Sequence, residues 1–75
     1  MASEQEREEK RDIALLEAAL YVSGRPLDLK TLASVVKTRS KNKAQRLLQK
    51  LIEAYRSRET AIEVLSLQDE RYVLQ

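Results

Sequence analysis

The sequence has 75 residues, with 14 Lys and Arg against 12 Asp and Glu, and it contains no cysteine and no histidine. A chain of this length forms one small domain that buries only about 60% of its unfolded surface, so we expect extra burial against a partner chain, a second copy or a following domain. The missing residue types exclude disulfides, the usual zinc, iron and copper ligand sets, and Ser/His or Cys/His nucleophiles, so we expect no metal or cofactor.

The charges are unevenly distributed along the chain. Acids exceed bases by three from Met1 to Gly24, ten Lys and Arg face two acids from Arg25 to Arg58, and four acids face one Arg from Glu59 onward. The basic middle is suited to attract phosphate or an acidic partner surface. No apolar run approaches the roughly 20 residues that span a bilayer, and the acidic N-terminus is unlike a secretory signal. We therefore expect a soluble, unprocessed protein of the reducing cytosol with no membrane contact.

Residues 1–12 are predicted to be a charged N-terminal extension of the first helix. Ser3 and Glu6 have the spacing of a capping box, which predicts a helix start near Glu4. A frayed tail up to Arg11 is the open alternative. Three ion pairs at helical spacing would support the helix, namely Glu6 with Lys10, Glu4 with Arg7, and Glu8 with Arg11.

From Ile13 to Ser23 this helix is apolar around most of its circumference, and only Glu17 and Ser23 are clearly polar. One small core does not require so wide an apolar surface. We interpret the surplus as a contact surface for another chain or domain, and the alternative is burial under the chain's own helices and sheet. The predicted dimer or partner contacts are Ile13, Leu15, Leu16, Ala19, Leu20 and Val22.

The only glycine and the only proline predict where this helix ends. Gly24 can adopt the positive φ of a helix end, and Pro26 cannot continue a helix. Asp28 is a predicted N-cap, after which apolar residues recur at the spacing of a second helix: Leu29, Leu32, Ala33 and Val36. Two helices joined by so short a turn are expected to pack on each other.

A third helix is predicted from about Lys41 to Ser57, with Thr38 and Ser40 as candidate caps. Its apolar positions keep the 3.6-residue period, and its other face is basic. The predicted contacts for nucleic acid or an acidic partner are Arg39, Lys41, Lys43, Arg46 and Lys50. The alternative is a solvated helix face with no ligand.

The last part of the chain changes to the two-residue period of strands. Strands are predicted over 60–67 and 71–74 around a polar turn at Gln68–Glu70. The alternation slips between Val64 and Leu65, which suggests a bulge or a strand buried on both faces. The predicted fold over residues 13–75 is therefore α+β: a winged helix, with a three-helix helix-turn-helix core and a C-terminal two-stranded β-wing.

The run LLEAALYVSGRPLDLKTLA at residues 15–33 resembles the hEAhLFhSGxPLxxxxLA pattern of the segregation and condensation protein B (ScpB) family, in its first winged-helix domain, where h is apolar. The likeness returns at Ile62–Val64 and at Tyr72–Leu74. The chain departs from the family pattern at Tyr21, where phenylalanine is usual, and at Gln68–Glu70, where the wing turn is often glycine-rich. Family members normally carry a second winged-helix domain.

The resemblance implies a non-catalytic subunit of the prokaryotic SMC–kleisin condensin complex, which acts in chromosome segregation and condensation. Such subunits dimerise, largely through this domain, and bind the kleisin ScpA, which bridges the heads of the SMC ATPase. It also implies a cytoplasmic protein that reaches the nucleoid through the complex.

Two other classes of function fit the sequence less well. A winged-helix DNA-binding transcriptional regulator would use the third helix, but the acidic wing turn and the absence of interleaved aromatics predict that direct DNA binding is weak or absent. An enzyme is not expected, because Glu53 and Glu63 are isolated and a single glycine builds no phosphate loop. The three tyrosines are interpreted as core-edge residues: Tyr21, Tyr55 and Tyr72.

Overall fold

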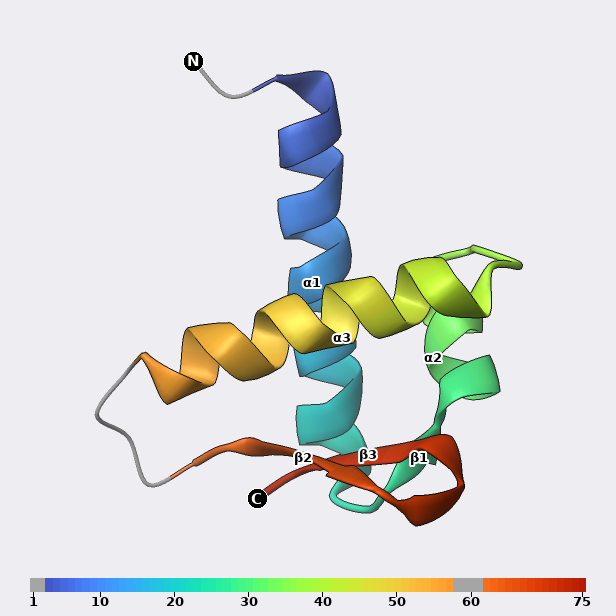
Figure 1. Ribbon diagram of the computed structural model, residues 1–75, viewed down its shortest axis with the longest axis vertical. Coiled ribbons are helices and arrows are strands. Elements are labelled where there is room, and N and C mark those ends of the chain that lie inside the picture. The colour runs from blue at the N-terminus through green and yellow to red at the C-terminus, as the bar shows by residue number, and fades with distance from the viewer. Residues whose placement is uncertain (1–2, 58–61) are drawn as a thin grey trace.

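The computed structural model describes residues 3–57 and 62–75 and shows three helices and a small sheet (Figure 1). The predicted α+β winged helix is confirmed. Residues 60 and 61 of the predicted first strand lie outside the described residues. In chain order the elements are α1 (Glu4–Ser23), β1 (Leu27–Asp28), α2 (Leu29–Val35), α3 (Lys41–Arg56), β2 (Val64–Leu67), the 3₁₀ turn η1 (Gln68–Glu70) and β3 (Arg71–Leu74).

Helix α1 begins and ends at the predicted signals. Ser3 Oγ accepts a hydrogen bond from the Glu6 backbone N–H at 3.2 Å, and Gly24 ends the helix in the left-handed region at φ 59°. The predicted boundary after Asp12 falls inside this continuous helix. Figure 1 shows the N-terminal half of α1 projecting beyond the rest of the fold.

The next two helices are capped by their predicted residues. Asp28 accepts a hydrogen bond from the Thr31 N–H at 2.7 Å and so caps α2. Ser40, rather than Thr38, caps α3 by accepting from the Lys43 N–H at 3.1 Å. Thr38 instead accepts from the Ser40 N–H at 3.1 Å and so shapes the loop before the cap. Helix α3 crosses the middle of α1 (Figure 1).

The sheet is antiparallel with the strand order β1-β3-β2. β1 was not predicted, and it pairs Leu27 with Tyr72 and Asp28 with Arg71, which ties the start of α2 to the hairpin. The β2–β3 register runs without a break from Val64↔Leu74 to Leu67↔Arg71. The break in the apolar alternation between Val64 and Leu65 is therefore not a bulge.

The core is formed by leucines from all three helices, covered by Val64 and Tyr72 of the sheet. Its largest fully buried side chains are Leu16, Leu20, Leu29, Leu32, Leu47 and Leu48. Two of these were predicted to contact a partner. That prediction is wrong for Leu16 and Leu20, because each is 0% exposed within its own chain and presents nothing to a second one.

Candidate functional site

Helix α1 carries apolar side chains on two opposite faces. Leu16 and Leu20 point into the core, with Ile13 and Ala19 packed partly against it. At 3.6 residues per turn, a second set of apolar residues lies within an arc of roughly 120° on the other side of the helix. We call this set the outer face of α1, and it consists of Ala14, Leu15, Ala18, Tyr21 and Val22.

The outer face holds three of the four large apolar side chains that are exposed among residues 3–57 and 62–75. Leu15 is 42% exposed, Tyr21 71% and Val22 82%, and Ala14 and Ala18 are also exposed. Scattered exposed apolar side chains are normal, but five on one helix face form a continuous patch, which is typical of a protein-contact surface. The side chains of this face are apolar apart from the hydroxyl group of Tyr21.

The predicted contact residues thus divide into three groups. Leu15 and Val22 are on the outer face, Ile13 and Ala19 are half-buried, and Leu16 and Leu20 are core. The predicted contacts did not include the other three outer-face residues, which a strict projection at the helical period places on this face: Ala14, Ala18 and Tyr21.

The tyrosines behave differently from one another. Tyr55 and Tyr72 are 9% and 8% exposed and lie at the core as predicted, and the Tyr55 hydroxyl donates a hydrogen bond to the Glu17 carboxylate. The same interpretation is wrong for Tyr21, because that side chain is 71% exposed. An aromatic side chain with an apolar body and a polar tip is well suited to a protein interface.

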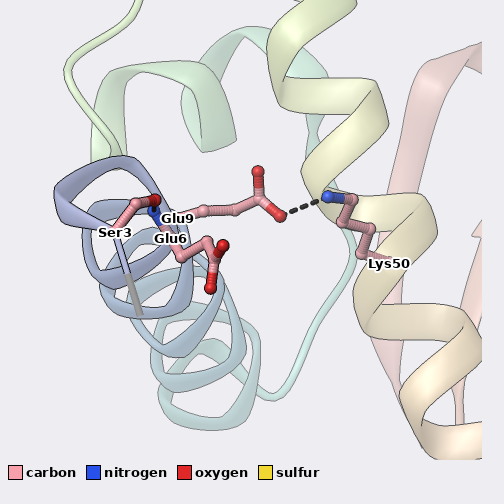
Figure 2. Close-up of polar contacts among 4 residues, drawn as sticks. All are labelled: Ser3, Glu6, Glu9 and Lys50. Atoms are coloured by element: carbon pink, nitrogen blue, oxygen red, sulfur yellow. Dashed lines mark hydrogen bonds and ion pairs between the residues drawn. The ribbon is translucent and has the colours of Figure 1, made fainter. Parts of the chain in front are cut away.

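The basic face of α3 lies beside the acidic half of α1. Figure 2 shows Glu9 extending from α1 to Lys50 on α3, with which it forms an ion pair. The hydrogen bond from Lys50 lowers the pKa of Glu9, and the positive charges of Lys50 and Arg46 act in the same direction. A groove of about 270 Å³ runs between the helices and is lined by Gln5, Glu8, Glu9, Asp12, Lys43, Arg46 and Leu47.

Acids also lie near the N-terminal end of α3. Lys41 Nζ lies 3.7 Å from the Glu70 carboxylate of the wing turn. The hydrogen bonds from Thr31 lower the pKa of Asp28, and the charges of Lys30 and Lys41 lower it further. Four of the five predicted basic contacts therefore lie next to carboxylates, and Arg39 shares a hollow with Lys30 and Lys41.

In the folded chain, acidic residues thus lie beside the basic residues of the middle segment and compensate their charge. The acids of α1 and of the wing turn flank the basic helix, so an approaching phosphate meets carboxylates as well as cations. The three ion pairs predicted within α1 are not formed. Among residues 3–57 and 62–75, the ion pairs are Glu9 with Lys50 and Lys41 with Glu70.

Within the described part of the chain, no three His, Cys, Asp or Glu side chains gather in a way that could hold a metal ion. No described helix has the length and apolar character needed to cross a membrane.

Comparison with known proteins identifies the family of the chain. The family described as segregation and condensation complex subunit ScpB matches residues 14–75, which include the outer face of α1, the helix-turn-helix core and the wing. No individual curated protein matches the chain. Because the family match covers most of the sequence, the chain belongs to the ScpB family of segregation and condensation complex subunits.

Proposed function

We propose that this chain is a self-associating, non-catalytic module of its complex, in which two copies pack through the outer faces of α1. The observation that carries the proposal is the exposed apolar patch of Leu15, Tyr21 and Val22. A two-fold dimer presents the same patch from both copies, so one apolar face suffices for both sides of the contact. A second copy would also add buried area to a core that is small for a chain of 75 residues.

In this role the dimer acts as a protein scaffold rather than as an enzyme. Family membership supports the kleisin ScpA as its partner and, through ScpA, the SMC ATPase. The proposed location is the cytoplasm, with the nucleoid reached through the complex.

The decisive variant is Val22→Lys, measured by sedimentation equilibrium at tens of micromolar. A lysine within the apolar contact must be desolvated, so we expect the dimer to be lost. The last turn of α1 holds no basic residue, and a cation there interacts favourably with the helix dipole, so the fold should be as stable as before.

The matched control is Ile62→Lys, which replaces another exposed apolar residue, 43% exposed and remote from α1 in sequence. We expect this variant to remain a dimer. The proposal is refuted if the unmodified chain is a monomer, or if both lysine variants have the mass of the unmodified dimer.

We also propose that direct DNA contact is weak or absent, because the carboxylates of Glu9 and Glu70 flank the basic helix. Labelled duplex titrated at two salt concentrations tests this. Phosphate contacts would make the affinity fall steeply with salt. A tight complex that weakens steeply with salt, and that Lys43→Glu abolishes, would contradict the proposal and restore the DNA-binding alternative.

A further inference from the structure

We infer that the N-terminal half of α1 masks a phosphate-binding face of α3, so that the chain's own carboxylates occupy cations that otherwise bind duplex DNA. We call residues 4–12 the acidic arm, and we call Lys43, Arg46 and Lys50 the masked cations. The inference concerns a different surface from the proposed self-association. It rests on the weak DNA contact proposed above and adds that the barrier is removable, because the cations themselves are competent to bind phosphate.

The masked cations form one line along α3. Their spacing of three and four residues places them on one side of the helix, where they span about 10 Å. All three are exposed, in contrast to the buried leucines on the core side of α3. Lysine and arginine side chains in such a line are suited to contact successive phosphates of a DNA strand. In helix-turn-helix proteins that bind DNA, the helix in this position enters the major groove.

The acidic arm lies against this line of cations. Glu9 forms an ion pair with Lys50 (Figure 2), and Glu8 and Asp12 line two hollows with Lys43, of about 270 Å³ and 440 Å³. Every residue of the arm is polar, and within it Glu9 and Asp12 are the half-buried ones. These two carboxylates therefore lie where the phosphates of a bound DNA strand would have to approach the cations.

The contact between arm and cations is electrostatic and can be displaced. The arm contributes no apolar side chain to the core, and the Glu9 and Lys50 side chains remain 30% and 46% exposed in their ion pair. Exposed ion pairs of this kind are individually weak. The carboxylates still compete well with an external anion, because they belong to the same chain and so act at a high effective concentration. DNA must displace them, and it loses part of its electrostatic attraction in doing so.

The test removes the two half-buried carboxylates of the arm and measures binding to labelled duplex DNA. The arm variant Glu9→Gln, Asp12→Asn neutralises two acids and so raises the net charge of the chain from +2 to +4. The matched control Glu6→Gln, Glu63→Gln makes the same change in net charge at two exposed positions. In Figure 2 the Glu6 side chain does not extend to Lys50. Circular dichroism checks that each variant keeps its helix content.

We expect the arm variant to bind about ten-fold more tightly than the unmodified chain at low salt, because two negative charges beside the phosphates are removed. Three cations on three phosphates give a salt slope of about −2.7, so this affinity should fall about 40-fold between about 50 and 200 mM salt. Adding Lys43→Gln should remove most of the gain. The control should gain no more than about three-fold, because its removed charges are distant and screened.

An equal gain in the control would assign the effect to net charge rather than to the arm. No gain in the arm variant would show that the masked cations do not bind phosphate, and either result overturns the inference. If the arm variant loses helix content, Asp12→Asn alone is compared with Glu63→Gln alone, and equal affinities of these two also overturn it. All these results leave the proposed weak DNA contact standing. Tight, salt-sensitive binding by the unmodified chain refutes that proposal itself.

Discussion

Neighbouring residues of α1 should respond in opposite ways to truncation, because Leu20 is 0% exposed and Tyr21 is 71% exposed. Leu20→Ala removes a fully buried side chain and leaves a cavity, which typically costs 2.7–5 kcal/mol. A 75-residue domain has a total free energy of unfolding of about 4–11 kcal/mol, so this change removes a large share of it. Tyr21→Ala removes little burial within one chain and gains up to ~0.7 kcal/mol of helix propensity.

The assay is urea unfolding followed by circular dichroism at two protein concentrations. The lower concentration keeps the chains monomeric, and the higher one, tens of micromolar, favours the dimer. The unmodified protein should unfold at a higher urea midpoint when it is more concentrated, because association stabilises the folded state by mass action.

Leu20→Ala should lower the midpoint at both concentrations. Tyr21→Ala should match the unmodified protein when dilute and lose the rise when concentrated. The reasoning fails if Tyr21→Ala lowers the dilute midpoint as much as Leu20→Ala does, since Tyr21 would then be part of the monomer's own core.

Three further predictions concern the local signals of the fold. Ser40→Ala should lower the free energy of unfolding by about 1 kcal/mol through loss of the α3 N-cap, and Ser40→Asp should restore it, as measured by urea unfolding. Gly24→Ala should cost about 1 kcal/mol and Gly24→Asn less, because φ is 59° and no atom lies within 4 Å of an added Cβ, so only the backbone conformation opposes the change. Glu9→Gln should lower the melting temperature at neutral pH and low salt but not in acid. The pKa of Glu9 is lowered by Lys50, so the carboxylate's stabilising effect is present above its ordinary pKa and is lost as the pH falls through the lowered value. A melting-temperature difference that persists in acid would contradict the last prediction.

Short-range signals predicted the helices well. Ser3, Gly24, Asp28 and Ser40 mark helix ends at the positions where the structure has them. Each of these residues acts on backbone groups within three or four positions along the chain, and so its effect depends little on the rest of the fold.

The missed features depend on contacts between distant parts of the chain. The apolar circumference of α1 was evident, but the position of α3 decides that Leu16 and Leu20 face the core while Leu15 and Val22 do not. Strand β1 has only two residues and follows Pro26 directly, so no period-two pattern could reveal it.

The charges show the same limit. Glu9 is paired with Lys50, which lies 41 positions away, rather than with a neighbour on its own helix. Local spacing predicts pairs at three and four residues only. The acids of α1 compensate the charge of the basic helix because α1 and α3 lie side by side in the fold, and local spacing does not predict that arrangement.

The central claim is that the outer face of α1 is built to meet a second copy of the chain. Sedimentation equilibrium of the unmodified protein at tens of micromolar tests it most directly. The account predicts a molar mass of twice the 8.7 kDa of one chain. A mass of 8.7 kDa at every concentration tested would contradict it.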